Sequence, residues 1–158
     1  MQIGGDELVT SPDADAINEL RQTWSWLLPE RYEPVLFSAL GDVFYETTDG
    51  EVWWLNTGTA ELQKIARTMQ EFQRLLGTEC ADHWFLPSLI EKLRRADKIL
   101  APGQCYTFVR LPIFAEGTYT IENLNPVPAK EHFGLTGELH KQIRHLKDGD
   151  KVRLRIVE

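Results

Sequence analysis

Four carboxylates are concentrated in and around one predicted β-hairpin. They are Asp42, Glu46, Asp49 and Glu51, and no Lys or Arg lies between residues 39 and 55. Neighbouring carboxylates perform general acid–base chemistry when one of them is desolvated and its pKa is raised. Side chains at a hairpin turn are usually solvated, so this pattern does not favour catalysis.

Cysteine and histidine offer two further kinds of chemistry. Cys80 precedes His83, and His140 and His145 lie further along, but structural zinc sites use more closely spaced ligand pairs. Cys105 has histidines downstream that would suit a Cys–His pair, yet it lies in an alternating strand pattern, where a thiol is buried and unreactive. We interpret both cysteines as reduced and buried, and the sequence predicts no metal and no cofactor.

Aromatic side chains accompany the carboxylates on the same hairpin. Most such rings belong to the core, but here they alternate onto both faces of the predicted sheet, so we expect one or two to be exposed. An exposed Trp among carboxylates is typical of an interface anchor. The predicted partner-binding residues are Asp42, Glu46, Asp49, Glu51, Trp53 and Trp54.

The net charge of −7 is unevenly distributed. Residues 1–59 contain 11 Asp and Glu against two Arg, whereas the acids and bases of the remaining residues nearly balance. Such a surface repels phosphate backbones and anionic lipid, which argues against nucleic-acid and membrane binding. It favours a basic protein partner, although a merely solubilising surface is the alternative.

The length of 158 residues indicates a single domain. Residues 1–12 are polar and predict a mobile tail, and residues 13–158 predict the folded domain. The first residues lack the basic and apolar regions of a signal peptide, and no apolar run is long enough to span a membrane. The cytoplasm is therefore the expected compartment.

Hydrophobic periodicity predicts the elements of the first half. Apolar residues from Ile17 to Leu28 predict a helix that starts near Asp13 and stops at Pro29. Residues 35–39 predict a strand, and residues 42–48 and 51–56 a hairpin around Asp49-Gly50, where Gly accepts a positive φ. Further helices are predicted over residues 59–76, capped by Thr59, and over residues 80–95.

The second half continues with strands at residues 105–111 and 119–124 and a helix at residues 133–146. In residues 152–156 the apolar side chains Val152, Leu154 and Ile156 alternate with basic ones, which predicts an edge strand with a basic outer row. Strands grouped in hairpins indicate an α+β fold, with a mainly antiparallel sheet packed against three to four helices in a single domain.

Short motifs in a fixed order resemble one family. They are Gly41-Asp42-Val43-Phe44, residues 49–58, Leu62-x-x-Ile65-Ala66, Gly103-Gln104-Cys105-Tyr106-x-Phe108, Gly117-Thr118-Tyr119-x-x-Glu122-Asn123-Leu124, His132, Gly137, His140-x-Gln142-Ile143 and Leu146-x-Asp148-Gly149. Together they resemble the C-terminal domain of type VI secretion immunity proteins, a bacterial domain often joined to a GAD-like domain. The resemblance spans about residues 35–155. It departs at residues 111–117, where the family tends to have paired prolines and glycines.

The resemblance implies a cytoplasmic immunity protein, not an enzyme, that binds and neutralises a cognate protein toxin. A nuclease with a basic surface would suit the acidic first third of the chain. One alternative is a small-ligand sensor or minor enzyme, with a pocket between the sheet and the helix at residues 133–146 near Tyr106, Tyr119, His132 and His140. Another is an oligomeric scaffold that uses the edge from Lys151 to Arg155.

Overall fold

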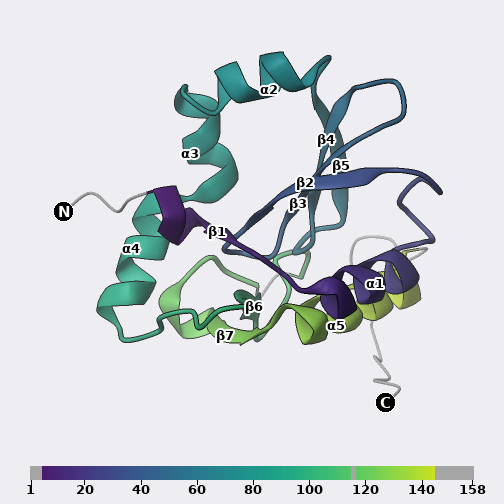
Figure 1. The fold of residues 1–158 in the computed structure, drawn as a ribbon. Coiled ribbons are helices and arrows are strands. Elements are labelled where there is room, and N and C mark those ends of the chain that lie inside the picture. Colours follow the sequence, from purple (N-terminus) through teal and green to yellow (C-terminus); the bar gives the residue numbers. More distant parts are fainter. Residues whose placement is uncertain (1–4, 115–116, 145–158) are drawn as a thin grey trace.

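The structure, a computed structural model, describes residues 5–114 and 117–144 and has the predicted α+β architecture (Figure 1). A five-stranded antiparallel sheet has the order β1-β2-β3-β4-β5, and β6 and β7 form a second, two-stranded antiparallel sheet. The strands are β1 (Val9–Thr10), β2 (Glu33–Ser38), β3 (Val43–Glu46), β4 (Val52–Asn56), β5 (Glu61–Ala66), β6 (Gln104–Phe108) and β7 (Leu124–Pro128). The helices are α1 (Ala14–Thr23), α2 (Met69–Leu75), α3 (Glu79–Phe85), α4 (Pro87–Arg95) and α5 (Ala129–Ile143), with 3-10 turns at Gly5–Leu8 and Ile121–Asn123.

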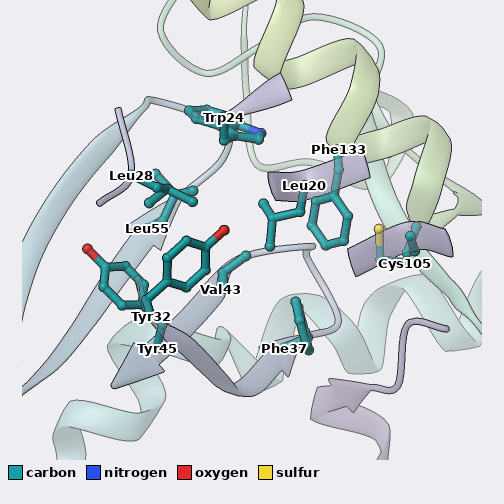
Figure 2. Close-up of a cluster of buried hydrophobic side chains, with 12 residues drawn as sticks. Leu20, Trp24, Leu28, Tyr32, Phe37, Val43, Tyr45, Leu55, Cys105 and Phe133 are labelled. Atoms are coloured by element: carbon teal, nitrogen blue, oxygen red, sulfur yellow. The ribbon is translucent and has the colours of Figure 1, made fainter. Parts of the chain in front are cut away.

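Helices cover both faces of the five-stranded sheet, as Figure 1 shows. On one face, α1 and α5 lie side by side and pack against alternate residues such as Val43, Tyr45 and Leu55 (Figure 2). On the other face, α2 and α3 pack against Phe44 and Val52. Alternation along each strand therefore divides the apolar residues between two cores, in agreement with the expectation that rings lie on both faces.

A third apolar cluster joins α4 and the small sheet to the main body. The Tyr106 amide N–H donates to the Ala39 carbonyl at 2.7 Å, and the Thr10 hydroxyl donates to the Gln104 carbonyl at 2.6 Å. None of the described helices is both long and apolar enough to cross a membrane.

The predicted hairpin around Asp49-Gly50 is confirmed. Val43 pairs with Leu55 and Glu46 pairs with Val52, and the Gly50 amide donates to the Thr47 carbonyl at 2.9 Å. Gly50 has φ +85°, the left-handed conformation that a tight turn requires. The start of α1 is confirmed as well, because Asp13 Oδ1 accepts from the Ala16 amide at 2.9 Å and caps the helix.

The helix predicted over residues 59–76 is wrong in its first half. Residues 61–66 form strand β5, which follows a turn in which Asn56 Oδ1 accepts from the Gly58 amide at 2.9 Å. Helix α2 begins only after Thr68, whose hydroxyl accepts from the Glu71 amide. The helical spacing of apolar residues was outweighed by the unpaired backbone groups along the edge of β4, which β5 satisfies.

The single helix predicted over residues 80–95 is two helices. Leu86 adopts φ +49°, and Pro87 occupies the first position of α4, where its missing N–H costs no hydrogen bond. Cys80 lies exposed in the first turn of α3, so the prediction that it is buried is wrong. Cys105 is buried, as predicted.

Several predicted boundaries also shift. Residues 121–123 form a 3-10 turn and the strand begins at Leu124, while α5 begins at Ala129, earlier than residue 133. Strand β1 pairs with β2 within the segment that was expected to be a mobile tail, so the fold begins earlier than residue 13. The predicted strand at residues 152–156, with its basic edge, lies outside the described residues.

Candidate functional site

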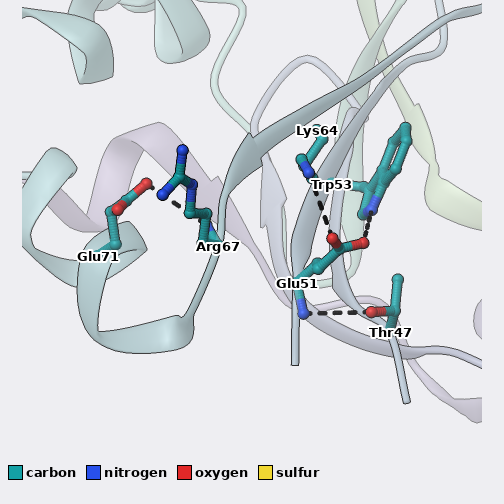
Figure 3. Close-up of polar contacts among 6 residues, drawn as sticks. All are labelled: Thr47, Glu51, Trp53, Lys64, Arg67 and Glu71. Atoms are coloured by element: carbon teal, nitrogen blue, oxygen red, sulfur yellow. Dashed lines mark hydrogen bonds and ion pairs between the residues drawn. The ribbon is translucent and has the colours of Figure 1, made fainter. Parts of the chain in front are cut away.

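The predicted partner-binding residues divide into an outer and an inner group. Asp49 is exposed at the hairpin tip, and Glu46, Glu51 and Trp53 are half-buried. Figure 3 shows Glu51 between two partners: its carboxylate accepts from Trp53 Nε1 at 3.4 Å and pairs with Lys64 Nζ at 3.3 Å. These outer residues form a polar surface on the hairpin that solvent can reach.

Asp42 and Trp54 belong to the interior, although the sequence had indicated a solvated carboxylate at residue 42. Their exposed fractions are 4% and 8%. Trp54 stacks on Phe44 with ring centroids 6.1 Å apart, and its indole Nε1–H donates to Asp42 Oδ2 at 3.3 Å. The carboxylate is covered because Asp42 follows a tight turn that lies against α5 rather than at the molecular edge.

Asp42 is part of a buried polar network with Thr57, Thr107, His132 and His140. Asp42 Oδ1 accepts from the Thr57 amide at 3.0 Å and lies 3.2 Å from its hydroxyl. That hydroxyl lies 2.8 Å from His132 Nε2, and His132 Nδ1 lies 2.8 Å from the Thr107 hydroxyl. The His140 Nε2–H donates to the Thr57 carbonyl at 2.9 Å. The network therefore joins the main sheet, β6 and α5 through hydrogen bonds that are mostly buried.

Burial shifts the pKa values of this network toward neutral side chains. It raises the pKa of Asp42 to about 7, although the hydrogen bonds from Thr57 and Trp54 act in the opposite direction. It lowers the pKa of His132 to about 4, against the effect of a hydrogen bond with the Gly41 backbone. Burial also lowers the pKa of His140. The interior therefore favours the uncharged forms of all three groups.

Gly41 is required at its position by two independent constraints. Its φ of +82° is the left-handed conformation that glycine adopts most easily, and an added Cβ would lie 2.2 Å from His132 Nε2. The turn is closed by the Gly41 amide, which donates to the Ser38 carbonyl at 2.9 Å. The absence of a side chain at residue 41 thus allows the His132 ring to pack against the turn.

Above Asp42 lies a pocket of about 400 Å³, here called the aromatic pocket. Trp54, Asn56, Glu61 and Gln63 line it from one face of the sheet, since they alternate along β4 and β5. The remaining walls come from α3, from the residue that follows it, from the turn before β3 and from the end of β6 and the segment after it. They consist of Leu40, His83, Trp84, Leu86, Phe108 and Tyr119, and Thr59 adds to the lining from the turn between β4 and β5. The pocket therefore combines aromatic rings with carboxylates at its floor and rim.

The four residues of the alternative pocket prediction do not gather around one opening. Tyr106, His132 and His140 have exposed fractions of 1% or less, so they do not face solvent. Tyr119 is 39% exposed and lines the aromatic pocket instead. Two of the four, His132 and His140, share Thr57 as a hydrogen-bond partner. The sequence analysis did not predict this connection.

A sequence signal for the network exists in α5. His132, Thr136 and His140 recur every four residues, which places them on one face of a helix, and all three are buried. A polar row on a face shared with Phe133 indicates a buried hydrogen-bonded network, because buried polar groups need partners.

The described residues contain neither a metal-binding cluster nor an activated Cys105 thiol. Among residues 5–114 and 117–144, no group of three or more His, Cys, Asp or Glu is arranged to hold a metal ion. Burial raises the pKa of the Cys105 thiol, which disfavours the reactive thiolate. The arrangement is that of a rigid interior beneath a small pocket and an acidic hairpin.

Comparison with known proteins finds a family match over 75 of the 158 residues. Residues 66–140 match the family model described as T6SS immunity protein Tdi1, C-terminal. The matched segment includes Trp84, Tyr119, His132 and His140, whereas the motifs of residues 41–58 lie before it. A search of curated proteins found no match. The finding supports a relation of this segment to the C-terminal domain family of type VI secretion immunity proteins.

Proposed function

We propose that this protein neutralises a cognate toxin by binding it, without performing catalysis itself. The family match of residues 66–140 is the observation that carries the proposal. The burial of His132 and His140 supports a binding role, because a general base must come within about 3 Å of the proton that it abstracts. The protein acts in the compartment where its toxin acts, which we propose is the cytoplasm.

The outer hairpin surface is the proposed contact. Glu33 and Glu46 are directly opposite each other on β2 and β3, and neither forms an ion pair with any described residue. Like charges in this position destabilise a sheet, so the pair is better explained by a partner than by the fold. Asp49 adds exposed negative charge at the tip, whereas Lys64 partly neutralises Glu51.

A basic toxin surface complements this hairpin. Nucleases bind phosphate backbones through Lys and Arg, so we propose that the toxin is a nuclease and that the acidic hairpin steers its approach. Trp53 is half-buried and hydrogen-bonded to Glu51, which suits an interface anchor held in one orientation. Asp42 and Trp54 contribute from the interior, by supporting the sheet and the floor of the aromatic pocket.

The test measures association with the product of the neighbouring gene. In the hairpin variant, Glu46→Gln, Asp49→Asn and Glu51→Gln remove three negative charges. At low salt we expect its association rate constant to fall at least about fivefold and its salt dependence to flatten. Dissociation should change less, because exposed charges act mainly on encounter.

A matched control removes the same charge elsewhere. Asp97→Asn, Glu122→Gln and Glu131→Gln alter exposed side chains on other elements. If this control slows association as much as the hairpin variant, the effect comes from net charge, and the proposed contact surface is wrong. If the wild-type protein does not bind the toxin at all, the proposed function itself is refuted.

A further inference from the structure

The walls of the aromatic pocket are held in fixed orientations before any ligand arrives. The Trp54 indole is hydrogen-bonded to Asp42 and meets the His83 ring edge-on, with centroids 5.9 Å apart. Tyr119 meets Phe108 edge-on, with ring centroids 5.5 Å apart. Rings fixed in this way lose little conformational freedom when a ligand binds.

The charge of the pocket has one sign. Asp42 and Glu61 line it, and no Lys or Arg is among the described residues of its walls. Both carboxylates are close enough to Tyr119 to act on its phenol. Glu61, Gln63 and His83 are exposed, so the mouth is open to solvent. An anion would meet the Glu61 carboxylate, whereas a cation would be attracted by Glu61 and by the faces of the rings. Asp42 adds negative charge only in its ionised form, which its burial disfavours.

We propose that the aromatic pocket receives a guanidinium group, that of an arginine side chain on the toxin. A guanidinium is planar, stacks on aromatic faces and forms paired hydrogen bonds with a carboxylate. The volume of about 400 Å³ lies at the small end of ligand pockets, which suits one side chain better than a large cofactor. This inference rests on the proposed function and adds a second, more enclosed contact to the hairpin surface.

The first experiment tests the chemistry without the toxin. An arginine blocked at both ends is titrated into the protein, and the indole N–H signal of Trp54 is followed by NMR after assignment with Trp54→Phe. We expect a saturable shift with a dissociation constant in the millimolar range, which is ordinary for a single side chain. Blocked citrulline, which has nearly the same shape but no charge, should produce no saturable shift.

Two pairs of variants test the walls of the pocket. Tyr119→Leu removes the aromatic ring and should weaken binding of blocked arginine at least about threefold, whereas Tyr119→Phe keeps the ring and should bind within twofold of wild type. Glu61→Gln should weaken binding by a similar factor, and Glu131→Gln on α5 should not. Equal binding of arginine and citrulline, or equal effects of Tyr119→Leu and Tyr119→Phe, would overturn the inference.

The second experiment uses the toxin and separates the two proposals. We expect Tyr119→Leu with Glu61→Gln to weaken toxin binding at least about tenfold, chiefly through faster dissociation, because an enclosed contact resists separation. Toxin binding that is unaffected by these variants overturns the arginine inference and leaves the proposed function standing. If no toxin binds the wild type, the proposed function fails, and so does the arginine's assignment to a toxin.

Discussion

The buried carboxyl of Asp42 should make folding stability depend on pH in a way that a single substitution removes. Burial raises its pKa from 3.8 to about 7 in the folded protein. Between these values the folded state keeps a proton that the unfolded state has lost, so stability falls as pH rises. Between about pH 5 and pH 8, this group alone should remove about 2.5 kcal/mol from the free energy of unfolding.

Asp42→Asn keeps the shape of the side chain and cannot ionise. The variant loses one acceptor for the Trp54 indole N–H, which lowers its stability by an amount that does not depend on pH. The unfolding free energy of Asp42→Asn minus that of wild type should therefore increase by about 2.5 kcal/mol from about pH 5 to pH 8, so the variant gains stability relative to wild type as pH rises. His132 and His140, whose pKa values are lowered and which destabilise the fold on acidification, contribute equally to both proteins and cancel in this difference.

The assay is urea unfolding at intervals of half a pH unit, followed by tryptophan fluorescence and far-ultraviolet circular dichroism. Asp49→Asn supplies the control, since it makes the same chemical change at an exposed hairpin residue and should follow the wild-type profile. If the profiles of wild type and Asp42→Asn are parallel, the hydrogen bonds from Thr57 and Trp54 hold Asp42 ionised. The assignment of a neutral interior would then be wrong at its central residue.

Two further predictions concern a turn and the thiols. Gly41→Ala should destabilise the fold by at least about 3 kcal/mol, because its Cβ would overlap the His132 ring. Gly50 has a similar φ but open space around it, so Gly50→Ala should cost only about 1 kcal/mol. Equal losses of stability in urea unfolding would contradict the overlap. Cys80 is exposed and should react with a colorimetric disulfide reagent within minutes, as followed by absorbance. Cys105 is buried and should react only at the rate of unfolding. Two rapidly reacting thiols in the native protein would show that Cys105 is accessible.

The hairpins and the general architecture were predictable from the sequence because their signals are local. Asp49-Gly50 between two aromatic strands specifies a tight turn, and that turn is present. The failure at residues 61–66 has the opposite cause. Leu62, Ile65 and Ala66 fit a helix equally well, and only the unpaired edge of β4, which a local pattern does not contain, decides for a strand.

The candidate site was less predictable because it is assembled from distant segments. Asp42 follows a glycine, as many solvated turn residues do, and nothing near it in the sequence indicates that Thr57 and Trp54 surround its carboxylate. His132 and His140 were recognised as candidates, but for a pocket that they do not line. The spacing of polar residues on α5 was the available signal, and it indicated a buried row rather than an opening.

Asp42 connects the two features from which the function is inferred. One of its carboxylate oxygens is held by Thr57, the residue that also contacts His132 and His140, and the other accepts from the Trp54 ring that lines the aromatic pocket. The floor of the pocket is therefore fixed by the interior of the domain. A protein that must bind one partner tightly benefits from such a rigid floor, because little ordering remains to be done on binding. His132 and His140 are enclosed in this network, and neither lines the pocket. The same burial that encloses the histidines thus holds the Trp54 ring in place at the pocket before a partner arrives.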